Sequence, residues 1–128
     1  MTPDLTWLVW TVALTFVLTM ISATGGTLQI GLGPLAGNRE GLPPATGWAG
    51  RARRAHMNML ESLPLFAALI LTAHVAGRVN AMVLLGAQLF FWARVAHAAI
   101  YIAGIAWIRT VAFFVAVVGM VLIFLQLL

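Results

Sequence analysis

The chain has 128 residues, of which 62% are hydrophobic and only 8% are charged. Soluble domains carry about 25% charged residues, so a globule of this length could not bury so much apolar surface, and lipid must solvate part of it. The net charge of +4 comes from arginines near helix ends and inside apolar runs, which excludes a nucleic-acid-binding face, and the absence of cysteine excludes disulfides and thiolate metal sites.

The apolar stretches predict four transmembrane helices. The first covers residues 5–28, which hold no charge, and a polar loop with two prolines separates it from a second helix over residues 48–76. The third and fourth cover residues 81–103 and 105–127. Each has about the 20 residues needed to cross the hydrocarbon core. The sequence therefore predicts an all-α integral membrane protein, a four-helix bundle with residues 1–128 as one domain.

The positions of the arginines predict the orientation in the membrane. Most of them flank the first and third connections, whereas the opposite side has only Arg78. Under the positive-inside rule, these two connections face the cytoplasm and both termini lie outside. A single arginine near a helix end is usually only an anchor at the membrane surface, so Arg39, Arg53 and Arg78 need no other explanation.

The second predicted helix carries a stripe of polar side chains. At about 100° per residue, Arg51, Arg54, Asn58 and Glu61 fall on one narrow face, and His56 points to nearly the opposite side. An unpaired carboxylate inside a membrane is expensive. Glu61 is therefore expected to face protein, water or a cation.

A second stripe lies on the third predicted helix. Arg94, His97 and Tyr101 follow one another at spacings that place them on the same helical face. Arg109 and Thr110 open the fourth helix at the same side of the membrane. Three helices thus direct polar groups to one end of the bundle.

Two explanations of this cluster differ in what the arginines do. An ion pair between Glu61 and Arg94 would fasten the second helix to the third, and we expect this pair to form. Arg51, Arg54 and Arg109 would still lack acidic partners. Unpaired guanidiniums in a half-buried cleft favour an anionic ligand, because arginine binds carboxylates through two parallel hydrogen bonds. The alternative is that these arginines are unrelated membrane anchors.

The histidines do not predict a metal site. His56 and His97 lack a convincing third ligand, and His74 is interpreted as a lone interfacial residue near the outer end of the second helix.

The segment from Arg54 to Phe66, RAHMNMLESLPLF, resembles the signature of the MAPEG family, the membrane-associated proteins in eicosanoid and glutathione metabolism. The resemblance extends through RVAHAAIY, which ends at Tyr101, and IRT at residues 108–110, so it spans the second to fourth helices. It implies a homotrimer that binds glutathione between neighbouring subunits, near the cytoplasmic face. The lack of lysine and the alanine- and arginine-rich composition predict a bacterial member of the family, and hence an inner-membrane protein.

The same resemblance assigns the site residues. It implies glutathione-binding roles for residues of the second and third helices: Arg54, Asn58, Glu61, Arg94, His97 and Tyr101. Arg51 joins them as a further arginine for the carboxylates. Arg109 matches the arginine that faces the glutathione sulfur, and Thr110 stands where some members use a serine. These last two are the predicted catalytic residues.

Some positions depart from the family pattern. Met57 occupies a position that is basic in some eicosanoid-making members, Phe113 stands where some have tyrosine, and Gln29 replaces an arginine. These differences argue against eicosanoid synthesis.

The predicted function is a membrane-bound, glutathione-dependent transferase or peroxidase with a detoxification role. Glutathione is the expected co-substrate, and the second substrate is a hydrophobic electrophile or lipid hydroperoxide from the bilayer. Two alternatives stay open: a non-catalytic member that binds lipid or glutathione, and a small transporter. Because arginines surround Glu61, the sequence argues against a cation exporter.

Overall fold

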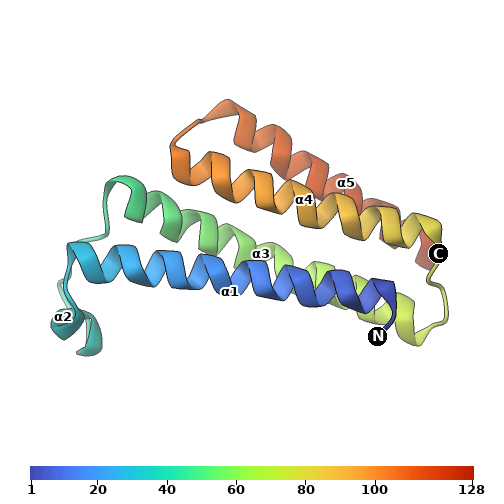
Figure 1. Cartoon of the computed structure of the whole chain (residues 1–128), viewed down its shortest axis with the longest axis horizontal. Helices are drawn as coiled ribbons and strands as arrows, with labels where there is room; N and C mark the ends of the chain where they lie inside the picture. The colour runs from blue at the N-terminus through green and yellow to red at the C-terminus, as the bar shows by residue number, and fades with distance from the viewer.

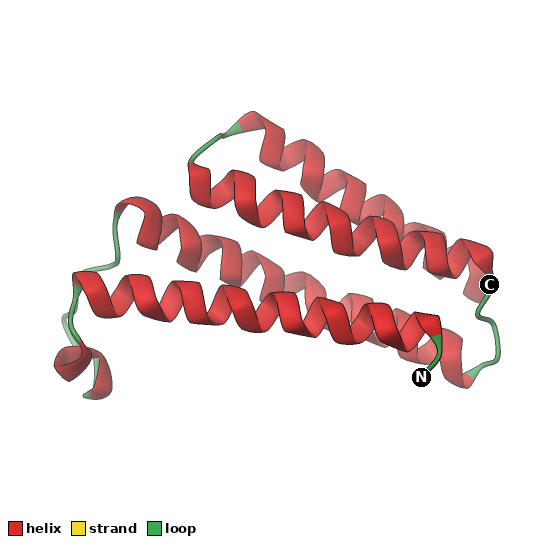
Figure 2. Cartoon of the chain, in the orientation of Figure 1, coloured by secondary structure: helices red, strands yellow, loops and turns green.

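The computed structural model describes all 128 residues, and helices connected by short loops make up the chain (Figures 1 and 2). The helices, in chain order, are α1 (Pro3–Gln29), α2 (Leu32–Ala36), α3 (Gly47–Val75), α4 (Ala81–Ala103) and α5 (Trp107–Leu127). All except α2 are long and apolar enough to cross a membrane. The predicted all-α membrane architecture is confirmed, with helix bounds that differ by two residues or fewer. The short α2 is not predicted, because its glycines and proline are typical of a break.

Hydroxyl groups are accommodated in α1 by bonding within the helix. Thr11, Thr15 and Thr19 each donate a hydrogen bond to the carbonyl four residues earlier, over 2.8–2.9 Å. This pairing satisfies the hydroxyls without water, so these threonines do not prevent α1 from lying in an apolar environment.

The helices form two antiparallel pairs, α1 with α3 and α4 with α5 (Figure 1). The pairs meet where α3 packs on α4, and there the rings of Phe66 and Phe90 stack with centroids 4.1 Å apart. Within the second pair, the backbones approach closely at Gly86 and Gly119. A Cβ atom added to either glycine would lie 2.5–2.6 Å from the carbonyl oxygen of the other.

The two ends of the bundle differ in what they carry. Both termini and the α3–α4 turn lie at one end, and α2 and the α4–α5 connection lie at the other (Figure 1). At the second end, the Gln29 side chain donates to the Thr46 carbonyl and accepts from the Thr46 N–H, both at 2.8 Å. These two bonds hold the start of α3 beside the end of α1. Gln29 thus has a structural role at the end of α1.

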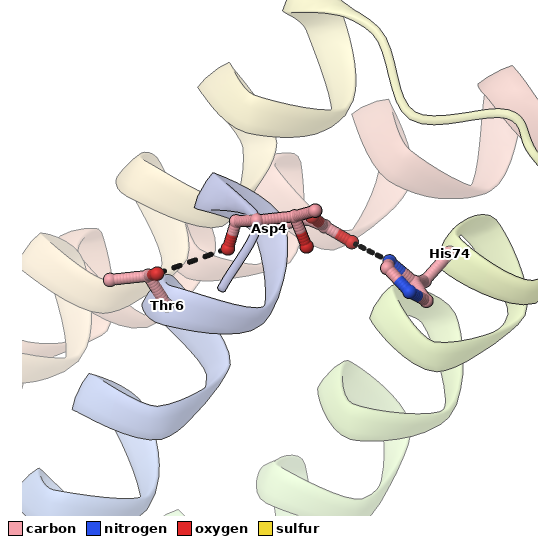
Figure 3. Close-up of polar contacts among 4 residues, drawn as sticks. Asp4, Thr6 and His74 are labelled. Carbon is pink, nitrogen blue, oxygen red and sulfur yellow. Dashed lines mark hydrogen bonds and ion pairs between the residues drawn. The ribbon is translucent and has the colours of Figure 1, made fainter.

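At the terminal end, an ion pair joins α1 to α3. Asp4 is fully buried, and its Oδ2 lies 2.9 Å from Nδ1 of His74 (Figure 3). His74 therefore has a partner, and the interpretation of it as a lone histidine is wrong, although its side chain stays partly exposed. Its partner lies 70 residues away in the chain, and only the packing of α1 on α3 brings the two together.

Candidate functional site

A polar cavity of about 380 Å³ lies at the end of the bundle that carries α2. Its walls come from α3, from the segment before α3 and from one residue of α4. The lining residues are Pro44, Ala45, Gly50, Arg53, Arg54, Met57, Asn58, Glu61 and Tyr101. The structure thus brings together Arg54, Asn58, Glu61 and Tyr101 of the predicted site. They share this wall because they lie on one face of α3 and on the adjoining turn of α4.

Tyr101 connects the polar cavity to α5. The Arg109 guanidinium carbon lies 4.3 Å from the centre of the tyrosine ring, and that of Arg54 lies 6.0 Å away. The His97 ring meets the same ring edge-on, with centroids 5.5 Å apart. A guanidinium within about 6 Å of an aromatic face is attracted to it. Tyr101 therefore holds Arg109 next to the cavity, although Arg109 does not line it.

Buried polar groups on α3 and α4 accompany the cavity. Arg94 and His97 of α4 are only 1% and 3% exposed. Arg94 donates from Nε to the Met59 sulfur at 3.3 Å, but its Nη1 has no partner. Nδ1 of His97 and Oδ1 of Asn58 are also buried without partners. Buried polar groups are nearly always paired, so these three atoms are exceptions within the single chain.

The predicted ion pair between Glu61 and Arg94 is wrong. The chain's one ion pair joins Asp4 to His74, and Glu61 is exposed on the cavity side of α3. Arg94 instead bonds to the sulfur of Met59, which is buried in the core. Met59 and Glu61 point in different directions from α3, so the Arg94 guanidinium that contacts Met59 does not reach Glu61. The carboxylate is left free.

Five of the predicted site residues do not line the cavity: Arg51, Arg94, His97, Arg109 and Thr110. Arg51 directs its Nε to the carbonyl of Ile102, 2.8 Å away at the end of α4. Thr110 is exposed in the first turn of α5 and does not line the polar cavity. Neither position could be judged from helical spacing, because each depends on how the α4–α5 connection folds back.

The sequence misses Arg53 as a site residue. This arginine, interpreted as a membrane anchor, lines the polar cavity together with Pro44 and Ala45. Its angular offset from Arg54 takes it off the polar stripe. Arg53 joins the site because the segment before α3, with Pro44 and Ala45, lines the same cavity. A helical projection of α3 alone does not contain that segment.

A second, lateral cavity of about 620 Å³ lies between α1, α2 and the first turns of α3. It shares Pro44, Ala45 and Arg53 with the polar cavity. His56, whose Nε2 lies 2.8 Å from the Thr19 hydroxyl on α1, is also part of its wall. The remaining wall is mostly apolar or small, with a second arginine: Ser22, Ala23, Gly26, Thr27, Ile30, Leu32, Leu35, Ala36, Arg39, Leu42 and Pro43.

Comparison with known proteins identifies the family. The sequence profile of the MAPEG family matches residues 5–128. The chain belongs to the MAPEG family. The resemblance carried by the polar motifs of α3, α4 and α5 is thereby confirmed. The family includes glutathione transferases and peroxidases, and its members generally use glutathione. No curated protein and no solved structure matches the chain.

The charges of the cavity fit the ligand used by MAPEG proteins. Glutathione carries two carboxylates and one ammonium group, and the cavity presents Arg53, Arg54 and Glu61. Arg94 and His97 each have a buried nitrogen atom without a partner. Donors therefore outnumber acceptors, as an anionic tripeptide requires. The structure contains no group of three or more His, Cys, Asp or Glu residues that could hold a metal ion.

Proposed function

We propose that this MAPEG protein is a membrane-bound, glutathione-dependent transferase or peroxidase. The observation that supports this most directly is the polar cavity, which combines two arginines and one glutamate with Arg109 stacked on the adjoining Tyr101. An amphipathic anion with one cationic group is complementary to that arrangement. A sulfur placed near Arg109 would be held close to a guanidinium that no carboxylate neutralises.

Binding is assigned to the residues that line the polar cavity. Arg53 and Arg54 hold the carboxylates of glutathione, Glu61 holds its ammonium group, and Asn58 contributes its side-chain amide to the same wall. Arg51, predicted for a carboxylate, does not line the cavity. The buried Arg94 guanidinium adds a further positive charge on α4.

The chemical task of the site is to favour the thiolate over the thiol. A free thiol has a pKa near 8.5, so only a few per cent is ionised at neutral pH. Lowering that value by about two units requires roughly 2.7 kcal/mol. Arg109 supplies this through its charge, and the exposed Thr110 hydroxyl donates to the sulfur.

The reaction then follows from the electron pair on sulfur. In transfer, a bond forms from sulfur to an electrophilic carbon while the bond to the leaving group breaks. In peroxide reduction, two thiols are oxidised to a disulfide, and the hydroperoxide is reduced to an alcohol and water. The lateral cavity suits the second substrate, because its wall is largely apolar and it carries Arg39 and Arg53 for a polar head.

The proposed setting is a homotrimer in a bacterial inner membrane, with the polar cavity towards the cytoplasm. The arginine-rich connections and the positive-inside rule support this orientation. Family membership supports the trimer. Arg54 and Glu61 are exposed in the single chain, so one side of the polar cavity remains open for a neighbouring subunit.

The test is the ultraviolet absorbance of the thiolate when glutathione is added to the purified protein at neutral pH. We expect a thiolate signal in the wild type and its loss in Arg109→Ala. Arg78→Ala is the matched control, because Arg78 is exposed in the α3–α4 turn, which lies at the opposite end of the bundle (Figure 1). An absent signal in the wild type, or an unchanged signal in Arg109→Ala, refutes the mechanism.

One observation favours a non-catalytic binding protein as the second candidate. Neither Arg109 nor Thr110, the predicted catalytic residues, lines the polar cavity of the single chain. Turnover decides between the two functions. Glutathione binding without conversion of either a model electrophile or a lipid hydroperoxide would establish the binding protein. Cation export is disfavoured because Arg53 and Arg54 line the same cavity as Glu61.

A further inference from the structure

The last turn of α4 is closed by a residue of another helix. The final carbonyls of any helix lack partners within it. At α4, Gly104 N–H donates to the Tyr101 carbonyl at 3.0 Å, and Ile105 N–H donates to the Ile100 carbonyl at 3.2 Å. The carbonyl of Ile102 accepts instead from Arg51 Nε, at 2.8 Å. A positive charge from α3 therefore lies at the negative end of the α4 dipole.

Gly104 leaves the space that this contact needs. Its φ of +86° lies in the left-handed region that favours glycine. A Cβ added there would lie 3.3 Å from Nε of Arg51 and 3.4 Å from its guanidinium carbon. The guanidinium thus packs directly against the glycine backbone. Arg51 and Gly104 form one unit that joins α3 to the α4–α5 connection.

The segment held by Arg51 carries the groups that the proposed chemistry needs. Tyr101 directly precedes Ile102 and lines the polar cavity. Arg109 lies in the first turn of α5, just beyond the connection, and rests on the Tyr101 ring. Arg51 itself lines neither the polar nor the lateral cavity. Its contacts lead to the end of α4 and not to the binding surface.

We propose that Arg51 is a positioning residue, which holds the α4 terminus and thereby places Tyr101 and Arg109 for thiolate stabilisation. This inference rests on the proposed function for its catalytic consequence, but not for the structural contact. Hydrogen bonds from a charged donor are about twice as strong as neutral ones, and more so away from water. Removing Arg51 leaves the Ile102 carbonyl unpaired and frees the connection to move.

The first measurement is amide hydrogen exchange on the full-length protein in lipid nanodiscs. In Arg51→Gln we expect exchange at Gly104 and Ile105 to accelerate roughly tenfold or more, as the loss of a charged hydrogen bond implies. Arg78→Gln is the matched control and should leave both amides unchanged. Unchanged exchange at these amides in Arg51→Gln overturns the proposal, whatever happens to glutathione binding.

The second measurement separates positioning from binding. We expect Arg51→Gln to keep its glutathione Kd within about threefold of the wild type, while the thiolate signal falls, because the carboxylates are assigned to other arginines. Weakened binding with normal exchange would make Arg51 a ligand residue. Faster exchange with a full thiolate signal would also overturn the positioning role.

A second variant at a different position distinguishes loss of this contact from a general folding defect of Arg51→Gln. Gly104→Ala puts a methyl group 3.3 Å from Arg51 Nε and strains the backbone at its positive φ, so it should reproduce both effects. Normal exchange and a full thiolate signal in Gly104→Ala would contradict the proposal. If the wild type binds no glutathione, the proposed function fails, whereas the exchange data still decide whether Arg51 holds the end of α4.

Discussion

Tyr101 is the only tyrosine of the chain, and it contacts both the binding surface and the group assigned to the sulfur. Its ring lies under Arg109 on one side and meets the His97 ring edge-on. An aromatic face attracts a guanidinium without neutralising its charge. A carboxylate in the same position would hold Arg109 as firmly, but it would remove the positive charge that a thiolate needs.

A substitution at this ring tests that distinction. Tyr101→Leu should lower the bound thiolate fraction about fivefold, because a cation–π contact of roughly 1 kcal/mol is lost. Tyr101→Phe keeps the aromatic face and should retain most of the signal. Thiolate absorbance with saturating glutathione measures both. A leucine variant that equals the wild type would show that the ring does not hold Arg109.

Which residues share a face can be predicted at the level of single helices, but their partners cannot. Helical geometry alone places Arg54, Asn58 and Glu61 together on α3, and the structure agrees. Arg94 was expected to reach Glu61 and instead reaches the Met59 sulfur. The rotation of α4 against α3 decides between these two acceptors, and that rotation depends on packing of both helices at once.

At the scale of elements, the approach of α4 to α5 leaves no room for a side chain at Gly86. The nearest atom to an added Cβ would be the Gly119 carbonyl oxygen, which belongs to the backbone and cannot rotate away. Small residues at such contacts let helix backbones approach closely in membranes. The pairing of these two helices therefore depends on these glycines.

Gly86→Ala should destabilise the protein by about 1–3 kcal/mol, the usual cost of overpacking. Thermal unfolding in one detergent, followed by circular dichroism, gives the comparison. Gly33→Ala in α2 is the matched control, because no atom lies within 4 Å of a Cβ added at Gly33. Equal melting temperatures for the two variants would mean that the helices separate without cost at this point.

The long helices can be predicted because the bilayer sets their length and excludes polar breaks. The bilayer does not set the length of the short α2, which lies between α1 and α3 and is not one of the candidate spans, so it is not predicted. The same holds for the Gln29 bonds to Thr46 and for the pair of Asp4 with His74. Each joins residues whose neighbourhood exists only after the helices have paired.

At the scale of the whole molecule, many large apolar side chains remain exposed on the outer faces of the bundle. The side chains of Trp10, Phe16, Phe114 and Phe124 are each at least half exposed. Such surface suits lipid or a neighbouring membrane subunit and not water. The bundle also separates its polar residues by end, with the cavity at the α2 end and both termini at the other.

The absence of cysteine makes the orientation directly measurable. In intact bacterial cells, Val79→Cys in the α3–α4 turn should react with a membrane-impermeant maleimide, and Asn38→Cys in the first connection should react only after the membrane is opened. Both positions are exposed in the structure. The reverse labelling pattern would place the polar cavity outside the cytoplasm.

The common wall of the two cavities has a kinetic consequence. Pro44, Ala45 and Arg53 line both the polar and the lateral cavity. A molecule that draws the Arg53 side chain into one cavity therefore removes its positive charge from the other. The apparent affinity for glutathione should then vary with the concentration of the hydrophobic substrate. Under the proposed function, rate equations need an interaction factor between the two substrates, and inhibitors of one should alter the KM of the other.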